Sequence, residues 1–346
     1  MKALVVDSFG PPDMAQMRDW PAPTPGAGEV RVEVHAMGIN FPDLLTVAGR
    51  YQNQPQPPFV PGKEAAGCVV EIGAGVRHLA VGDRVMLQLE CGAFAEEVVV
   101  VEEHCFRIPD SLPMVKAAAM GLTYQTAWFG LFDRASLQPG ETVFVTGAAG
   151  GVGVAAVQLA KAAGCRVLAG VSSREKADFV LGIGADAVVR TDGADLKDGV
   201  RQQVHEQNHG RGADVIIETV GGELFEACLR ALAWSGRLVV VGFAGGTIPS
   251  VKANYVLIKH ICVTGLHWSD YLYHYPERVR DAQARIFGFW REGRLDPPVS
   301  EIFPLARAAQ ALHAMAARRA LGKLVLETDR GHAARVESGT ATVARA

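Results

Sequence analysis

The sequence has few of the features that mark secreted, membrane-spanning or nucleic-acid-binding proteins. Its six cysteines are scattered and form no CxxC pair, so a disulfide framework is not expected. No apolar run approaches the roughly 18 residues of a membrane span, and the longest apolar tract, Leu238 to Ile248, is broken by glycines. The 34 basic and 37 acidic residues give a formal net charge of −3, which argues against nucleic acid or an anionic membrane as a partner.

Several catalytic and targeting motifs are missing as well. There is no GxSxG elbow, no Walker-type phosphate loop, no HExxH pair and no EF-hand loop, so the enzyme and calcium-binding classes built on them are not indicated. The first residues, MKALVVDSFG, enter a strand-like pattern without the anatomy of a signal peptide, and a cytoplasmic location is expected. With 346 residues, the chain is too long for one small core, so two domains are expected.

The most informative stretch that is present runs from Thr142 to Gly153 and reads TVFVTGAAGGVG. A β-branched and aromatic run ends there, glycines follow, and a helical pattern begins. Such a turn is typical of a phosphate site, because glycine lets the backbone approach a pyrophosphate and the helix N-terminus is positive. We therefore predict a dinucleotide-binding fold that contacts its cofactor through Ala149, Gly150, Gly151 and Val152.

The residues after the next strand indicate which dinucleotide binds. An acidic residue about 20 positions past the glycines would hold the ribose of NAD. Here the strand ends in Ser172 and Ser173, with Arg174 and Lys176 behind them. Hydroxyls and cations suit a 2′-phosphate, so Ser172, Ser173 and Lys176 predict NADPH. The alternative is an ordinary N-capped helix with solvated charges, and Glu175 is the one contrary residue.

Residue patterns divide the chain into a β-rich first third and an alternating β/α remainder from about residue 122. Continuous apolar runs of strand length in the second part suit a parallel sheet covered on both faces. The predicted strands are Lys2–Val6, Glu29–Ala36, Ala66–Ile72, Arg84–Leu89, Ala95–Val101, Cys165–Ser172, Ala213–Thr219, Arg237–Gly242, Ile261–Leu266 and Lys323–Glu327, and the predicted helices include Arg174–Leu181, Pro276–Glu292 and Leu305–Arg319. The tail Thr328–Ala346 is polar and unpatterned, so we expect it to be disordered.

Six motifs occur in the order of a known family. They are GIN-FPD (Gly38 to Asp43), PGKEAAG (Pro61 to Gly67), VGDRV (Val81 to Val85), GLTYQTAW (Gly121 to Trp128), the AAGGVG turn and GK-L-V-L (Gly322 to Leu326). With them the chain resembles the zinc-free, ζ-crystallin-like quinone oxidoreductases of the medium-chain dehydrogenase/reductase superfamily. The resemblance implies an α/β protein with a GroES-like β-barrel catalytic domain at 1–121 and 268–327. It also implies a Rossmann doubly wound domain at 122–267 and a homodimer that pairs strand Ile261–Leu266.

The resemblance also indicates that no metal is held. Zinc-dependent members of the superfamily have a cysteine where this chain has Asn40, and the histidine of a GHE motif where it has Lys63. A catalytic zinc needs three protein ligands from His, Cys or carboxylate, and neither substitute is a plausible ligand. The closely spaced cysteines of a structural zinc lobe are absent too, since only Cys91 lies between Val85 and Phe94.

The family resemblance then supplies the expected site residues, in a cleft between the two domains. Asn40 and Asp43 face the nicotinamide end, Tyr51 is the candidate proton donor, and Thr123 lies near the nicotinamide. Asn40 has the alternative role of capping helix Pro42–Val47, and Tyr51 that of anchoring a loop. Further cofactor contacts are expected from the ends of the last Rossmann strands and from the C-terminal region, at Gly242, Phe243, Ala244, Leu266 and either Arg318 or Arg319.

Without a metal, the chemistry that remains is hydride transfer from NADPH to an electron-poor acceptor. The main prediction is an NADPH-dependent, zinc-independent quinone oxidoreductase. The alternative is an enoyl- or acrylyl-thioester reductase, in which Tyr51 would matter more, because a hydroquinone oxygen can take its proton from water. A third interpretation is a non-catalytic NADPH-binding role, crystallin-like or RNA-binding.

Overall fold

The computed structural model describes residues 1–339, which form two compact units. Unit 1 comprises Met1–Leu122, Leu272–Phe287 and the chain from Pro297 onward, and unit 2 comprises Thr123–Tyr271 and Gly288–Asp296. Three helices begin in one unit and end in the other: α3 (Gly121–Trp128), α9 (Trp268–His274) and α10 (Pro276–Arg291). Across residues 1–339, no helix has both the length and the apolar character that crossing a membrane requires.

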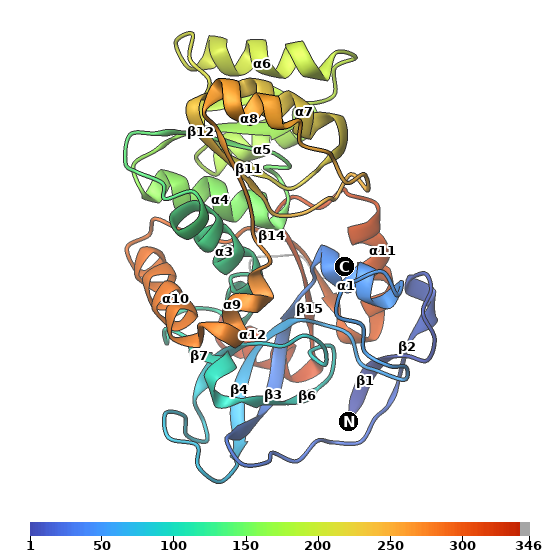
Figure 1. Ribbon diagram of the computed structural model, residues 1–346. Helices are drawn as coiled ribbons and strands as arrows, with labels where there is room; N and C mark the ends of the chain where they lie inside the picture. The colour runs from blue at the N-terminus through green and yellow to red at the C-terminus, as the bar shows by residue number, and fades with distance from the viewer. Residues whose placement is uncertain (340–346) are drawn as a thin grey trace. The chain divides into compact units, whose positions relative to one another are not determined.

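Unit 1 is built around strand β3 (Glu29–Gly38). This strand pairs antiparallel with β4 (Glu64–Ile72), β6 (Glu97–Val101) and β15 (Lys323–Glu327), so it joins the first third of the chain to the last (Figure 1). Its side chains alternate in burial, as expected for a strand with one face on a core. The sheet order is β14-β15-β3-β4-β5-β7, with β6 on β3 as well.

The other elements of unit 1 complete its hydrophobic core. The hairpin of β1 (Lys2–Val6) and β2 (Ala15–Asp19) contributes a fully buried run at its first strand. The remaining bounds are β5 (Arg84–Gln88), β7 (Cys105–Arg107), β14 (Val299–Pro304), α1 (Phe41–Val47), α2 (Met114–Ala117), α11 (Ala308–Ala316), α12 (Asp329–Glu337), and the short 3-10 helices at Pro12–Met14, Glu102–His104 and Leu305–Arg307.

The expectation of a disordered tail from Thr328 is wrong for its first part, which forms α12. The Thr328 hydroxyl caps this helix by accepting a hydrogen bond from the Gly331 amide at 3.0 Å. Arg335 pairs with the buried Glu327 carboxylate at 2.7 Å. A polar composition hid the helix from sequence analysis, because its order comes from a cap and a buried ion pair. The rest of the predicted tail, residues 340–346, lies outside the described residues.

Unit 2 contains a six-stranded parallel sheet in the order β10-β9-β8-β11-β12-β13. Its elements are β8 (Thr142–Val145), α4 (Gly151–Ala162), β9 (Arg166–Val171), α5 (Arg174–Gly182), β10 (Ala187–Arg190), α6 (Leu196–Gln207), β11 (Ala213–Glu218), α7 (Gly222–Ala231), β12 (Leu232–Val240), α8 (Ala253–Lys259) and β13 (Cys262–Gly265), with a π-helix at Phe129–Arg134 after α3. The strand order reverses at β8, and such a switch point is where ligands bind in open α/β sheets.

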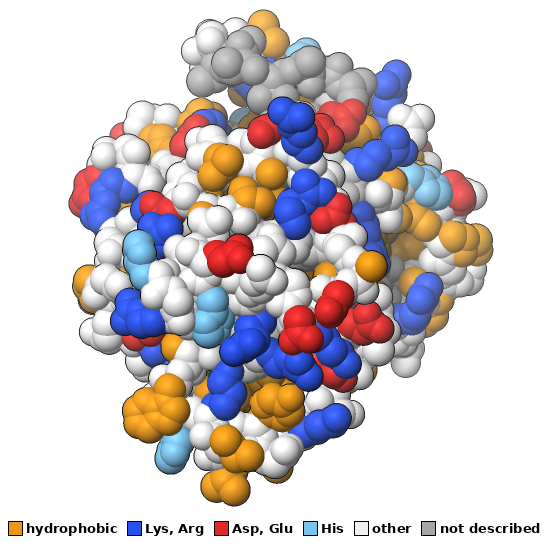
Figure 2. All heavy atoms as spheres, turned by 90° about the horizontal axis from the view of Figure 1, so that it is seen from above, with side chains coloured by type: hydrophobic (Ala, Val, Ile, Leu, Met, Phe, Trp, Pro, Cys, Tyr) orange, Lys and Arg blue, Asp and Glu red, His pale blue; other side chains and the backbone are white. Residues whose placement is uncertain are grey.

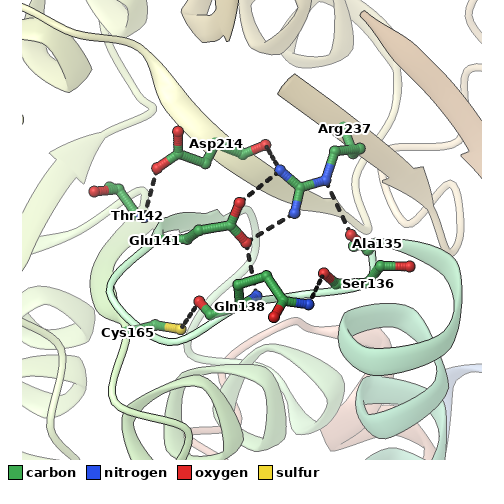
Figure 3. A network of polar contacts seen from close by, with 8 residues as sticks. All are labelled: Ala135, Ser136, Gln138, Glu141, Thr142, Cys165, Asp214 and Arg237. Carbon is green, nitrogen blue, oxygen red and sulfur yellow. Dashed lines mark hydrogen bonds and ion pairs between the residues drawn. The ribbon is translucent and has the colours of Figure 1, made fainter. Parts of the chain in front are cut away.

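A polar network fixes the segment that leads into β8 (Figure 3). The guanidinium of Arg237 donates to both carboxylate oxygens of Glu141 at 2.8 Å and to the Ala135 carbonyl at 2.9 Å. The Gln138 backbone amide also donates to Glu141, at 2.8 Å. Burial alone would raise the pKa of Glu141, but the bonds from Arg237 and Gln138 outweigh it and the pKa is lowered. The carboxylate is therefore held ionised at the entrance to the central strand.

Candidate cofactor and active sites

The glycine turn after β8 has the geometry that a pyrophosphate site requires. Gly147 adopts a positive φ of 58°, and a Cβ on Gly153 would lie 2.3 Å from the Gly147 carbonyl oxygen. Gly150 is the N-cap of α4 and supplies no side-chain cap. The first amides of the helix, from Gly151 onward, have no acceptor within it and are available to an anion. The turn therefore fits the diphosphate of a dinucleotide.

The two serines expected at the 2′-phosphate follow β9, the neighbour of β8. Ser173 caps α5 by accepting a hydrogen bond from the Lys176 amide at 3.2 Å, which is the ordinary capping role that was the alternative interpretation. Ser172, Arg174 and Glu175 are exposed beside it. The hydroxyl of Ser172 and the cations of this turn are therefore accessible at the carboxyl end of β9.

The other predicted cofactor residues of unit 2 follow later strands of the same sheet. Gly242, Phe243 and Ala244 come just after β12, where the Ala244 amide donates to the Thr219 carbonyl at 3.0 Å. Leu266 comes directly after β13, and its amide donates to the Val240 carbonyl at 3.0 Å. Since all strands are parallel, these residues gather with the glycine turn at one edge of the sheet.

Glu218, at the carboxyl end of β11, is a residue of this edge that sequence analysis missed. Its Oε1 accepts hydrogen bonds from the amides of Val220 at 2.8 Å and Gly221 at 2.9 Å. Its Oε2 is buried without a hydrogen-bond partner among the described residues, and burial raises the pKa of the carboxyl. The available signal was an acidic residue directly after the apolar run Val215–Ile217.

In unit 1, Asn40 belongs to a buried cluster with Lys323 and Glu64. The Lys323 ammonium donates to Asn40 Oδ1 at 2.7 Å and to Glu64 Oε1 at 2.7 Å. The Asn40 amide group donates to the same Glu64 oxygen at 2.8 Å, and the Leu122 backbone amide donates to Oε2 at 2.7 Å. Sequence analysis missed Glu64 and Lys323, although each is a charged residue at the start of an apolar strand.

Asp43 lies in the first turn of α1, where its Oδ2 accepts a hydrogen bond from the Asn40 backbone amide at 2.8 Å. Asn40 is the N-cap residue of this helix, as the alternative interpretation held. Asp43 is 1% exposed, and its Oδ1 has no hydrogen-bond partner among the described residues. Burial raises the pKa of Asp43 to about 7, against the lowering effects of Lys63 and of the Asn40 amide. This carboxyl therefore changes its protonation state near neutral pH.

Tyr51 is half-buried under the ammonium of Lys63. The Lys63 Nζ atom lies 4.2 Å from the centre of the Tyr51 ring, within cation–π range. The same atom donates to the Glu90 carbonyl and to Glu90 Oε2, both at 2.9 Å. Lys63 thus contacts the Tyr51 ring and lowers the pKa of Asp43. Tyr51 and Asp43 were predicted separately, and Lys63 interacts with both.

The predicted site residues therefore form two groups, one in each unit. Asn40, Asp43 and Tyr51 lie in unit 1, whereas the residues at the sheet edge lie in unit 2. Thr123 is buried on α3 and is the first residue of unit 2. Arg318 and Arg319 are exposed in the turn after α11 of unit 1, with Arg318 at a φ of 56°.

Comparison with known proteins identifies the family. Two family models match the chain: "Alcohol dehydrogenase GroES-like domain" over residues 26–110 and "Zinc-binding dehydrogenase" over residues 151–286. The quinone oxidoreductase-like protein 2 homolog of Nematostella vectensis is 40% identical over 306 residues, which are 88% of this chain and 82% of the relative. The chain belongs to the quinone oxidoreductase-like branch of the medium-chain dehydrogenase/reductase superfamily.

Solved structures agree with this family assignment. Escherichia coli quinone oxidoreductase complexed with NADPH matches with a TM-score of 0.87 and 28% identity, covering 94% of this chain and 100% of that chain. The mycobacterial protein Rv1454c complexed with NADPH matches with a TM-score of 0.88 and 31% identity, at the same coverage. The predicted fold class is confirmed: a GroES-like domain is combined with a Rossmann-type parallel sheet, and the protein is an oxidoreductase of this branch.

Asn40 and Lys63, the two residues expected in place of zinc ligands, are both engaged with other side chains. The Asn40 carboxamide bonds Lys323 and Glu64, and the Lys63 ammonium bonds Glu90. Ammonium groups would repel a dication, and among residues 1–339 no cluster of three His, Cys, Asp or Glu side chains could hold a metal.

Proposed function

We propose that this protein is an NADPH-dependent, zinc-independent enzyme that reduces quinones or similar electron-poor acceptors. The observation that carries the proposal is the state of Asn40 and Lys63, the residues expected in place of zinc ligands. Asn40 accepts a hydrogen bond from Lys323 at 2.7 Å, and Lys63 is paired with Glu90 at 2.9 Å. With a carboxamide and an ammonium in place of ligands, the chain offers no donor set there for a Lewis acid that would polarise an alcohol.

The chain's own residues suit NADPH as the hydride donor. The amides that open α4 would hold the diphosphate, and Ser172, Arg174 and Lys176 would select the 2′-phosphate. Asn40, Thr123, Gly242 to Ala244, Leu266 and Arg318 or Arg319 remain proposed contacts. NADPH, when bound, supplies the hydride. Two solved relatives carry NADPH in their structures, which supports the choice of cofactor.

The proton that accompanies reduction has two candidate holders in unit 1. Asp43, with a pKa of about 7, retains a proton on a sizeable fraction of molecules at neutral pH. Tyr51 carries a phenol whose ring lies 4.2 Å from the Lys63 ammonium. Quinone reduction depends weakly on either group, since a hydroquinone oxygen can be protonated by water.

The Tyr51–Lys63 contact is the specific observation that favours the second candidate function, reduction of an enoyl or acrylyl thioester. Such a reaction leaves a carbanion-like carbon that requires a positioned acid. The neighbouring ammonium holds the Tyr51 ring in place, as that role requires. The acceptor is therefore what separates the two candidates, and the cofactor is common to both.

The proposal also includes a cytoplasmic homodimer. Strand β13 ends the parallel sheet and pairs on one side only within residues 1–339, and an unpaired edge favours strand addition. Leu257 and Ile258 on the preceding helix are 76% and 71% exposed, which suits burial by a second copy. All six cysteines are free, which suits a reducing compartment. We expect no nucleic-acid partner.

The decisive experiment is an assay of NADPH oxidation with 1,4-benzoquinone, 9,10-phenanthrenequinone and crotonyl-CoA in turn, and with NADH in parallel. Turnover of the quinones with a preference for NADPH supports the main proposal. Turnover of crotonyl-CoA alone, lost in Tyr51→Phe, replaces it with the thioester reductase. Binding of NADPH without turnover of any acceptor overturns both and leaves a non-catalytic role.

A further inference from the structure

A pocket of about 740 Å³ opens in unit 2 away from the proposed cofactor edge. Its lining comes from α6, from the loop that leads into β11, from the end of α7, from the start of β12, and from α8. These are the amino-terminal ends of β11 and β12. The glycine turn follows the carboxyl end of β8, and the strands are parallel, so the pocket lies at the opposite edge of the sheet.

The pocket is lined by four cations: Arg201, Arg211, Arg230 and Lys259. Two of them have internal partners. Arg230 pairs with Asp198 at 2.9 Å, and the Lys259 ammonium donates to three backbone carbonyls at the end of α7, at 2.8 to 3.0 Å. Arg201 and Arg211 are exposed, and neither forms an ion pair within residues 1–339.

The lining carries more positive than negative charge. Burial lowers the pKa of Lys259, and the nearby Arg201 guanidinium lowers it further. Asp214 is the one acidic residue of the lining, and its carboxylate accepts a hydrogen bond from the Thr142 amide at 2.8 Å (Figure 3). The Asp214 carboxylate is therefore bonded to the backbone at the start of β8.

Two aromatic side chains stand beside these cations. Trp234 is 71% exposed, and its indole is 5.0 Å from the imidazole of His260, centre to centre. Tyr255 is half-buried and hydrogen-bonded to Arg230. Figure 2 looks onto the side of unit 2 that carries α6, where basic, acidic and hydrophobic side chains are mixed. An exposed indole next to guanidinium groups is typical of sites that bind a planar ring with an attached anion.

We propose that this pocket is a second ligand site, which binds a phosphorylated compound with an aromatic ring, of the size of a nucleoside monophosphate. Arg201 and Arg211 would bind the phosphate, because guanidinium forks match phosphate oxygens. Trp234 would stack on the ring. A volume of about 740 Å³ accommodates such a ligand with room to spare and lies within the range of small-molecule sites.

The test is calorimetric titration of 5′-AMP into the full-length protein, with adenosine and inorganic phosphate as partial ligands. The Arg201→Gln/Arg211→Gln double variant is expected to weaken AMP binding about tenfold or more, because two charge-assisted contacts are lost. Trp234→Leu is expected to weaken AMP and adenosine but not phosphate. Arg285→Gln is the matched control, since Arg285 is an exposed arginine of α10 without an ion pair in the described chain.

A cofactor-edge variant, Lys176→Ala, separates this site from the proposed NADPH site. Retention of AMP binding in Lys176→Ala, together with its loss in the double arginine variant, supports the second site. The proposal is overturned if the double variant binds AMP as the wild type does, or if Lys176→Ala abolishes all AMP binding. NADPH binding by the double variant, measured in parallel, shows whether the cofactor site is intact and keeps this test independent of the proposed function.

Discussion

The Nζ atom of Lys323 lies 2.7 Å from Oε1 of Glu64, and the two side chains are 4% and 0% exposed. The pair joins β15 to β4 through the core of unit 1, and Asn40 completes it. Two buried charges of opposite sign offset each other's desolvation only while both are present. The cluster therefore contributes to the stability of unit 1 and also fixes the position of the candidate site residue Asn40.

Removing one member of the pair should be severe. Lys323→Met leaves the Glu64 carboxylate buried without its cation, and we expect the free energy of unfolding to fall by about 3–5 kcal/mol. Urea denaturation at neutral pH measures this. The double variant Lys323→Met/Glu64→Gln, which removes both charges, should recover a large part of the loss. Equal destabilisation in the single and double variants would show that packing, not charge, dominates.

Asp43 should make stability depend on pH. Its folded-state pKa of about 7 lies above the ordinary value of 3.8, so the native state binds the proton more tightly than the unfolded state. The stability that Asp43 contributes through its tighter proton binding in the native state is fully present below about pH 4. It is lost as the pH rises from about 4 to about 7. Relative to wild type, Asp43→Asn should gain stability across this window, by up to about 4 kcal/mol, and stay level above it. A pH-independent difference in denaturation midpoint would contradict the assignment.

Tyr51 and Lys63 should affect the two classes of acceptor differently. Tyr51→Phe should lower kcat on crotonyl-CoA by about 10² or more if the phenol is the acid, and should change quinone turnover little. Lys63→Gln should produce a smaller loss in the same direction, because it removes the charge over the ring and leaves the phenol in place. Tyr275→Phe, a half-exposed tyrosine of unit 1, is the control. Equal losses on both acceptors would indicate a structural role for Tyr51.

The turn after β9 should determine the preference for NADPH. Arg174→Ala/Lys176→Ala should raise KM for NADPH about tenfold, since ion pairs with a phosphate are lost, and leave KM for NADH nearly unchanged. Glu175 is the exposed acidic residue between them. Glu175→Gln should leave the KM for NADPH unchanged or reduce it slightly, because it removes a negative charge near the phosphate. Parallel steady-state measurements with both cofactors test this. A rise in KM for both would place these side chains elsewhere on the cofactor.

Arg237 should stabilise unit 2 through the segment before β8. Arg237→Met removes a bidentate bond to Glu141 and a bond to the Ala135 carbonyl, and should lower the free energy of unfolding by about 2 kcal/mol. Arg190→Met is the matched control, because Arg190 pairs with Asp192 on the exposed surface and such pairs contribute little. Similar losses in the two variants would mean that the network of Figure 3 has no special weight.

The parts of the molecule that the sequence predicts well are those with local signals. β1 and β15 have the predicted bounds, and the glycine turn lies between β8 and α4 as its residue pattern requires. β12 begins earlier than predicted, at Leu232, because Ser235 at a φ of 60° bulges the strand around Trp234. Asn40 and Asp43 were named as candidate residues because they match a family motif.

The partners of those residues could not be read from the sequence in the same way. Lys323 and Glu64 are separated by 259 positions and meet only because β3 pairs with both of their strands. Lys63 was recognised as a missing zinc ligand, whereas its contact with Tyr51 depends on the path of the loop between them. Long-range pairings of this kind follow from sheet topology, which single-sequence patterns do not determine.

Strand β3 also has a consequence for synthesis of the protein. Its partner β15 begins at Lys323, after the whole of unit 2 has left the ribosome. Unit 2 is nearly continuous in the chain and can fold while the last residues are still being made. Unit 1 must wait with an open sheet edge, and with Glu64 lacking the Lys323 ammonium, until β15 arrives. Premature termination shortly before residue 323 would therefore leave a Rossmann unit beside an unfinished partner, the kind of product that quality-control proteases remove.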